Sequence, residues 1–142
     1  MPYRVVQWAT GGVGRASIDD IASHPDLELV GCWVHSESKV GQDAGELAGC
    51  GPLGVACTNS LDEILALDAD CVVYSPMIAN PREICALLES GKNVVTPLGW
   101  FYPALLDNSK IEAACAKGGT TLHGTGIHPG GITERFPLSV SA

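Results

Sequence analysis

The chain has 142 residues, of which 46% are hydrophobic and 17% charged, and its formal net charge is −8. These proportions are typical of one globular domain and argue against a disordered chain. Its basic residues are few and never adjacent, which argues against a nucleic-acid partner because that binding depends on clustered Lys and Arg.

Strand-like and helix-like segments alternate along the chain. In order, the first half of the pattern predicts a strand at 4–9, a helix at 13–23, a strand at 27–35, a mostly irregular stretch at 36–54 with one helical turn at 43–48, and a short strand at 55–57. The second half predicts a helix at 61–67, a strand at 71–74, a helix at 81–90, a strand at 93–96, a helix at 103–117 and a strand at 120–124. His123, inside the last strand, is expected to be buried.

This alternation, with short links, predicts parallel strands joined by right-handed crossovers. We therefore expect an α/β fold, a Rossmann-type doubly wound parallel sheet, as a single domain spanning 1–142. In that architecture ligands bind beyond the carboxyl ends of the strands. The residues directly after each strand are therefore the candidate site residues.

A glycine-rich turn, Ala9-Thr10-Gly11-Gly12-Val13-Gly14-Arg15, follows the first strand. Aligned with the Gly-x-Gly-x-x-Gly pattern, Ala9 takes the first glycine position, and Gly11 and Gly14 take the other two. Gly11 lets a diphosphate approach the backbone, Gly14 lets the helix pack closely on the strand, and the helix amides bind the anion. The alternative is a glycine-rich turn without a ligand. The predicted cofactor-binding residues of this turn are Thr10, Gly11, Gly12, Val13, Gly14 and Arg15.

The segment about twenty residues further on distinguishes NAD from NADP, because an acidic residue there would bind the ribose 2′-hydroxyl. The sequence instead reads Val34-His35-Ser36-Glu37-Ser38-Lys39. Ser36 and Lys39, together with Arg15, suit a 2′-phosphate, so NADP(H) is the preferred cofactor and His35, Ser36 and Lys39 are added to the site. NAD(H) through Glu37 stays possible, as does a Lys39 that is only a solvated loop residue.

No apolar run approaches the roughly 18 residues of a membrane-spanning helix, and residues 1–4 lead directly into a strand without a secretory signal. The six cysteines contain no Cys-x-x-Cys pair. We therefore expect free thiols, a cytoplasmic location, no membrane association and no metal site.

Three segments resemble a known family. Arg4-Val5-Val6-Gln7-Trp8-Ala9-Thr10-Gly11-Gly12-Val13-Gly14 is similar to the opening of the dihydrodipicolinate reductase N-terminal family. The segments 39–46 and 124–131, the latter reading Gly-Thr-Gly-Ile-His-Pro-Gly-Gly, resemble its branch that contains 2,4-diaminopentanoate dehydrogenase and related amine dehydrogenases. The resemblance implies a Rossmann domain followed, in relatives, by an α+β domain that completes the substrate site and the oligomer.

The resemblance also implies reversible hydride transfer between NAD(P)H and an imine carbon formed from a ketone and ammonia. The residues after strands four and five would line the cofactor near its nicotinamide, and 124–128 would lie beside the ring or the substrate. These implied cofactor contacts are Ser75, Pro76, Met77, Thr96, Pro97 and Thr125.

His128 is the candidate catalytic residue, because it lies in a loop shaped by glycine and proline and imidazole titrates near neutral pH. The alternative is that His128 caps the next helix or bonds a backbone carbonyl. Amine dehydrogenases of the branch carry an acidic residue just after strand five, whereas 96–103 contains none here.

Two functions therefore stay open. The first is an NAD(P)H-dependent oxidoreductase, or its cofactor-binding half, acting as a homo-oligomer on a small imine, amine or carbonyl substrate. The second is a non-catalytic nucleotide-binding or regulatory module.

Overall fold

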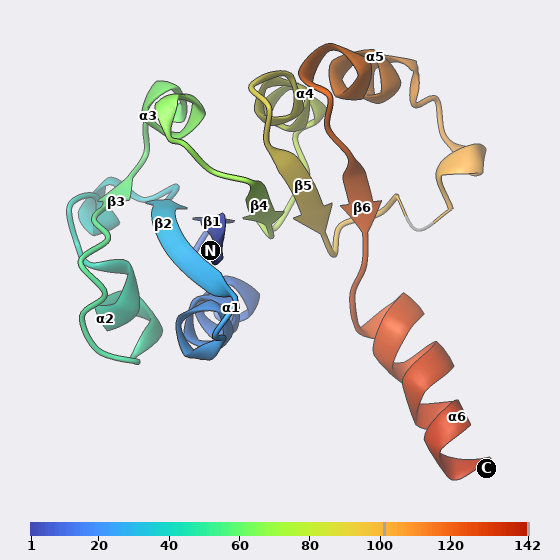
Figure 1. The fold of residues 1–142 in the computed structure, drawn as a ribbon, viewed down its shortest axis with the longest axis horizontal. Coiled ribbons are helices and arrows are strands. Elements are labelled where there is room, and N and C mark those ends of the chain that lie inside the picture. Colours follow the sequence, from blue (N-terminus) through green and yellow to red (C-terminus); the bar gives the residue numbers. More distant parts are fainter. Residues whose placement is uncertain (101, 142) are drawn as a thin grey trace.

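A parallel six-stranded sheet forms the centre of the molecule, with the strand order β3-β2-β1-β4-β5-β6 (Figure 1). The computed structural model describes residues 1–100 and 102–141. The strands are β1 (Tyr3–Trp8), β2 (Leu27–Trp33), β3 (Cys57–Thr58), β4 (Cys71–Tyr74), β5 (Asn93–Thr96) and β6 (Leu122–Gly124). Because the chain order reverses between β1 and β4, the expected doubly wound α/β fold is confirmed.

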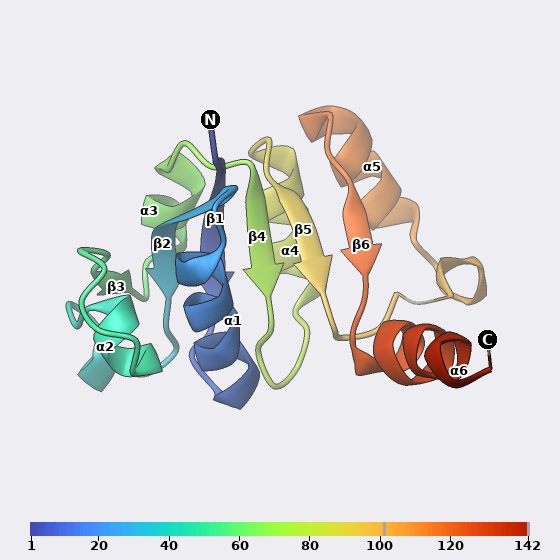
Figure 2. The ribbon, with the colours of Figure 1, turned by 60° about the horizontal axis from the view of Figure 1, so that its bottom comes forward.

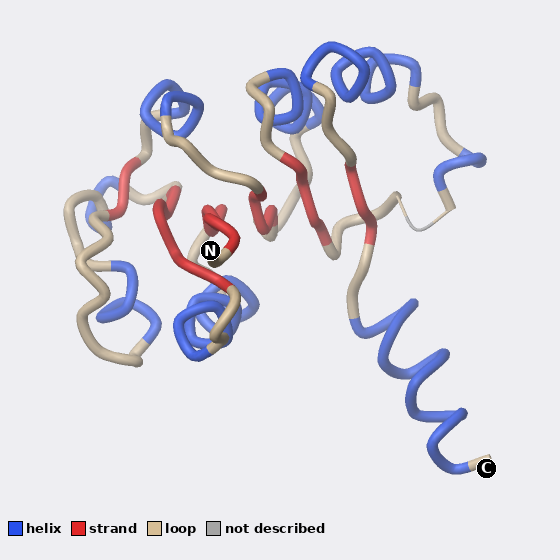
Figure 3. Tube along the Cα trace, in the orientation of Figure 1, coloured by secondary structure: helices blue, strands red, loops and turns tan. Residues whose placement is uncertain are grey.

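Helices cover both faces of the sheet (Figure 1). One face carries α1 (Gly12–Ser23) and α2 (Ala44–Ala48), and the other carries α3 (Leu61–Ala66), α4 (Pro81–Glu89) and α5 (Ser109–Gly118). Two short 3-10 turns, η1 (Glu37–Lys39) and η2 (Pro103–Leu105), lie in the connections. After β6, the π-helical segment η3 (Ile127–Arg135) continues into α6 (Phe136–Val140) and extends away from the sheet (Figure 3). No helix in the described part of the chain is long and apolar enough to span a membrane.

The core lies in two layers, because successive strand side chains point to opposite faces. Val5 of β1 packs in the cluster that contains Ile18 and Ile21 of α1. Val6 and Trp8 pack in the opposite cluster, with the buried residues of α3, α4 and α5. This burial on both faces explains why β1 reads as a nearly continuous apolar run.

Local signals place the ends of several helices. The Ser60 hydroxyl accepts a hydrogen bond from the Glu63 amide (3.3 Å) at the start of α3. Asn80 caps α4 in the same way (3.1 Å to the Arg82 amide), with Pro81 at the first helical position. Gly119 ends α5 in the left-handed conformation, with φ 66°.

The prediction of a helix at 103–117 is wrong for residues 103–108. The structure has η2, then an extended Leu106, and α5 begins only at Ser109. Asp107 accepts a hydrogen bond from the Ser109 amide (3.1 Å), and the Asn108 side chain donates to the Pro103 carbonyl (2.5 Å). These local side-chain bonds compete with the helical bonds of the backbone.

His123 was expected to be buried, but it is exposed. It lies on β6, the edge strand, and the cluster under α1 and α2 includes no residue of β5 or β6. Figure 2 shows α1 in front of β1, while among the described residues no helix lies in front of β5 and β6. The sequence pattern identified the strand but not its uncovered face.

Candidate functional site

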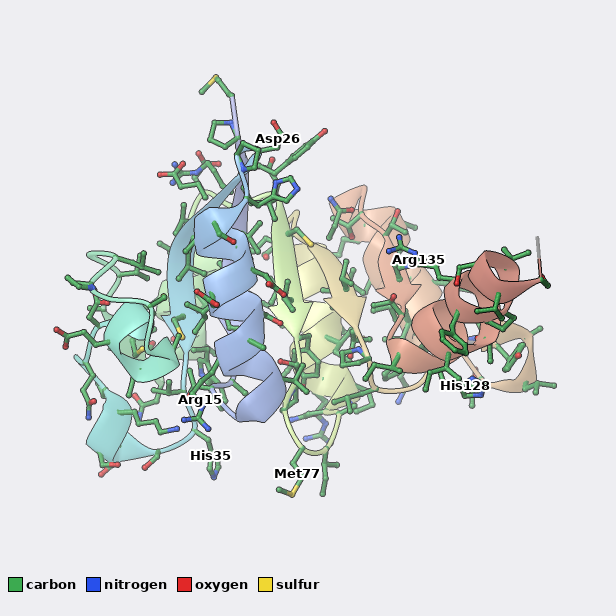
Figure 4. The ribbon with its side chains drawn as sticks, turned by 90° about the horizontal axis from the view of Figure 1, so that it is seen from below. Arg15, Asp26, His35, Met77, His128 and Arg135 are labelled. Atoms are coloured by element: carbon green, nitrogen blue, oxygen red, sulfur yellow. The ribbon has the colours of Figure 1, made fainter. Side chains whose placement is uncertain are left out.

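The loops that carry the predicted site residues meet at one edge of the sheet. Since β1, β2, β4, β5 and β6 are parallel, their carboxyl ends lie together. Figure 4 shows Arg15, His35 and Met77 at this edge and Asp26 at the opposite one. The reversal of strand order between β1 and β4 lies within this edge, where open α/β sheets place their ligands.

The glycine-rich turn presents the amino end of α1 to this edge. Gly11 is the N-cap residue, and the helix start has no side-chain cap. A Cβ atom added to Gly11 or Gly12 would meet no atom within 4 Å, so the backbone there borders open space. Gly14 is buried, and a Cβ atom on it would collide with the carbonyl group of Ala9. The first amides of a helix with no side-chain cap attract anions.

Lys39 brings a positive charge to the same turn. Its ammonium group donates hydrogen bonds to the Thr10 hydroxyl (3.0 Å) and to the Thr10 carbonyl (3.4 Å), across 29 positions of sequence. Ser36 and Ser38 share a hydrogen bond between their hydroxyl groups (2.8 Å) in the same loop. His35, Ser36 and Arg15 are exposed at this edge. The loop after β2 therefore offers hydroxyl groups and the Lys39 ammonium group next to the amino end of α1, which itself carries Arg15.

Gln7 was not among the predicted site residues, but its side chain is fully buried beneath the turn. Its amide nitrogen lies 3.0 Å from the Trp8 carbonyl oxygen, 2.9 Å from the Ala9 carbonyl oxygen and 2.9 Å from the Ser75 hydroxyl. Ser75 follows β4, so this side chain connects the ends of β1 and β4. The signal was present, because Gln7 is a polar residue inside an otherwise apolar strand.

A pocket of about 490 Å³ lies next to the turn, between the ends of β1, β2 and β4. Trp8 and Trp33 stack in it with ring centroids 4.4 Å apart and planes 8° apart. The pocket is lined by Trp8, Ala9, Trp33, His35, Pro76, Met77, Ile78, Asn80 and Glu83. An aromatic wall of this kind suits a flat, largely apolar ring. Trp8, Trp33, Ile78, Asn80 and Glu83 were not among the predicted site residues.

Tyr74 supports one wall of this pocket. Its hydroxyl donates to a Glu83 carboxylate oxygen (2.7 Å) and accepts from the Asn80 amide (3.0 Å). Burial, followed by the hydrogen bond to Glu83, raises the pKa of Tyr74, so the phenol stays protonated. Tyr74, at the end of β4, therefore holds the loop between β4 and α4 through its hydrogen bonds to Asn80 and Glu83.

The predicted residues of β5 and β6 form a second group. The Thr96 hydroxyl accepts from the Leu98 amide (3.1 Å), and the Thr96 carbonyl accepts from the Thr125 amide (2.9 Å). Pro97 lies close to Gly126. His128 is exposed on η3, at the far end of the sheet from His35 (Figure 4). The structure thus gathers the turn, the β2 loop and Ser75 to Met77, and it places Thr96, Pro97, Thr125 and His128 further along the edge.

The described residues contain no group of three or more His, Cys, Asp or Glu side chains arranged to hold a metal ion. All six cysteines are free; Cys32 and Cys57 are buried, and Cys50 is exposed. Neither observation adds a metal or a disulfide to the site.

Comparisons with known proteins agree with this geometry. The family model described as dihydrodipicolinate reductase, N-terminus, matches residues 5–96. An amine dehydrogenase of Streptomyces virginiae is 36% identical over 96% of this chain and 41% of its own length. A 4-hydroxy-tetrahydrodipicolinate reductase of Synechococcus elongatus is 48% identical over 44% of this chain and 23% of its own length.

Solved structures show the same fold. The amine dehydrogenase of Mycobacterium smegmatis superposes with a TM-score of 0.81 and 25% identity, over 100% of this chain and 44% of that one. The biliverdin reductase of Synechocystis, solved with biliverdin and NADP⁺, gives 0.70 and 22% identity, over 99% of this chain and 43% of that one. The chain therefore spans less than half the length of these relatives. Because the family model covers most of the sequence, the chain belongs to the dihydrodipicolinate reductase N-terminal family.

Proposed function

We propose that residues 1–142 form the dinucleotide-binding domain of an NAD(P)H-dependent oxidoreductase. The observation that carries this proposal is the amino end of α1, free of a side-chain cap, with Lys39 bonded to the same turn at the point where the strand order reverses. Backbone amides of this kind are what a diphosphate needs, and the nearby cation suits a second anionic group of the same cofactor. The family membership and the NADP⁺ in the biliverdin reductase neighbour support the same cofactor class.

The geometry suggests how the cofactor would lie. The diphosphate would rest on the amides of 11–14, and the adenine would enter the pocket beside Trp33. Pro76 and Met77, which were expected near the nicotinamide, line this pocket and would contact the adenine instead. A 2′-phosphate would meet Ser36, Arg15 and Lys39, which is the basis of our preference for NADP(H) over NAD(H). The nicotinamide would then extend toward Ser75, Thr96, Pro97 and Thr125.

The chemistry we propose is hydride transfer to a small imine or carbonyl carbon, or the reverse reaction on an amine. When bound, NAD(P)H supplies the hydride. A proton must reach the substrate nitrogen or oxygen in the same reaction, and His128 is the proposed donor. Because His128 lies far along the edge, we further propose that catalysis requires a homo-oligomer or further protein beside β5 and β6. We further propose a cytoplasmic location.

Titration of the chain with NADPH and with NADH, followed by nicotinamide fluorescence, tests the binding proposal. We expect saturable binding of both, with NADPH bound at least about tenfold more tightly, because charged hydrogen bonds of the kind Lys39 would make are worth about 1.5–3 kcal/mol. Lys39→Gln should remove most of this preference. The exposed Lys110→Gln, which changes the net charge equally, should retain it. Failure of both nucleotides to bind would refute the proposed function, and equal affinities would refute the NADP preference.

One observation favours a second candidate, a non-catalytic nucleotide-binding module. The stretch 96–103 contains no carboxylate to handle the proton of an amine. Turnover assays with NADPH, ammonia and a panel of small ketones test the module. Oxidation of NADPH that depends on the ketone contradicts it, whereas tight binding without turnover is expected both of the module and of a domain that needs further protein beside β5 and β6.

A further inference from the structure

Ala9 has an unusual backbone conformation at the start of the phosphate-binding turn. Its φ is 75°, in the left-handed region that glycine enters freely and that costs free energy for a residue with a Cβ atom. Ala9 occupies the first glycine position of the motif, so the turn must have this conformation although the residue does not favour it. Something else in the structure must stabilise it.

Gln7 supplies that stabilisation. Its amide nitrogen lies 2.9 Å from the Ala9 carbonyl oxygen and 3.0 Å from the Trp8 carbonyl oxygen. Because two carbonyl groups face it, only the NH₂ end of the side chain can lie there. The side chain is fully buried, so no water competes at this point.

Gly14 closes the other side of the same carbonyl group. A Cβ atom on Gly14 would collide with the Ala9 carbonyl and would lie 3.0 Å from the Gln7 amide nitrogen. The Ala9 carbonyl is therefore held between the Gln7 side chain and α1, facing the interior. With this carbonyl turned inward, the amides of the following residues are left at the open edge.

The same side chain also fixes β4. The Gln7 amide nitrogen lies 2.9 Å from the Ser75 hydroxyl, which donates in turn to the Trp8 carbonyl (3.4 Å). The two strand ends on either side of the ligand-binding crevice are thus connected through one buried side chain.

We propose that Gln7 is a positioning residue for dinucleotide binding: it holds Ala9 in the left-handed conformation and so presets the backbone amides of 11–14 for the diphosphate. This inference rests on the proposed function. Gln7 lies beneath the turn and does not touch the ligand.

The experiment compares Gln7→Met, which keeps the side-chain length, with the double variant Gln7→Met/Ala9→Gly. For each we would measure the dissociation constants of NADPH and of adenosine 2′-monophosphate, which lacks the diphosphate. We expect Gln7→Met to weaken NADPH about tenfold and adenosine 2′-monophosphate less than about twofold. Glycine needs no support in this conformation, so the double variant should recover NADPH affinity to within about threefold of the unchanged chain.

Lys92→Met is the matched control for the loss of a buried polar side chain. Lys92 is 2% exposed and precedes β5, at the opposite edge of the sheet. The variant Lys92→Met should leave the dissociation constants of NADPH and of adenosine 2′-monophosphate unchanged.

Three results would overturn the inference: no loss of NADPH affinity in Gln7→Met, an equal loss for both ligands, or no recovery in the double variant. If Gln7→Met does not fold, the double variant is compared with Ala9→Gly alone. The inference then requires NADPH affinities within about threefold of each other, and a tenfold difference overturns it. If the unchanged chain binds neither NADPH nor NADH, the proposed function fails and this inference fails with it.

Discussion

At the scale of single residues, the tightest steric constraint in the site lies at Gly14. The space for a side chain there is filled by the Ala9 carbonyl, whereas Gly12, two residues earlier, borders open space. The two glycines of one short motif therefore have different physical roles, and a methyl group tests each of them.

We expect Gly14→Ala to lower the free energy of unfolding by about 2 kcal/mol or more, because α1 must move away from β1. Gly12→Ala should change it by less than about 0.5 kcal/mol. Urea denaturation of the two variants measures both values. Equal stabilities would show that the Ala9 carbonyl can move aside, which would contradict the close packing of α1 on β1.

The site residues differ in how far the sequence could predict them. Thr10 and Lys39 could be proposed from a motif and a spacing, and the structure brings them into contact. Gln7 stands out in the sequence only as a polar residue in an apolar strand. Its role and that of Trp33 could not be predicted, because both depend on the register between β1, β2 and β4, which places Trp8 beside both Trp33 and Tyr74. Nor could the sequence show that His128 lies at the far end of the edge, since that depends on the direction of η3.

At the scale of elements, the order of strands and helices was predictable because each type of element has its own spacing of apolar residues and its own end signals. The order is confirmed, but the boundaries fail where side chains bond the local backbone, as at Asp107 and Asn108. The stretch 36–54 was expected to be mostly irregular with one helical turn, and α2 confirms that turn. Asp43, at the first position of the predicted turn, organises this segment, but the local sequence does not show that it also binds the loop before β3.

Asp43 accepts hydrogen bonds from the backbone amides of α2 and of the loop before β3, at 2.7–3.2 Å. Its donors are the amides of Gly45, Glu46, Leu53, Gly54 and Val55. Hydrogen bonds to the charged form, that from Leu53 first, lower the pKa of Asp43. One carboxylate thus serves as the N-cap of α2 and closes the loop that follows it.

Stability should depend on the charge of Asp43. Because the pKa is lower in the folded chain, its contribution is fully present above the ordinary Asp pKa of about 4 and is lost as the pH falls through the folded value. We expect Asp43→Asn to lower the urea midpoint at pH 7 and to flatten its fall below about pH 4. The exposed Asp19→Asn should keep the slope of the unchanged chain. Parallel curves for Asp43→Asn and the unchanged chain would contradict this role.

At the scale of the whole molecule, the fold separates into a well-packed part and an extended one. The sheet and α1 to α5 enclose the two buried clusters, and the candidate site joins the loops after β1, β2 and β4. In contrast, η3 and α6 form one continuous helical segment that extends away from the sheet (Figure 1) and exposes Ile127, Ile132, Phe136, Leu138 and Val140. Alternation of strands and helices predicted the first part, but the direction of the last helix has no counterpart in a local pattern.

This division predicts a pattern of hydrogen exchange. The amides of β1 and β4, buried on both faces, should exchange slowly in the free chain, and those of η3 and α6 should exchange fast, because local opening there breaks few contacts. Saturating NADPH should slow exchange further at 10–15, 36–39 and 75–80, since bound ligand stabilises only the folded form of the segments it joins. NADPH should leave the exchange rates of the η3 and α6 amides unchanged. Protection spread evenly over the chain, or centred on η3, would place the nucleotide elsewhere than at the amino end of α1.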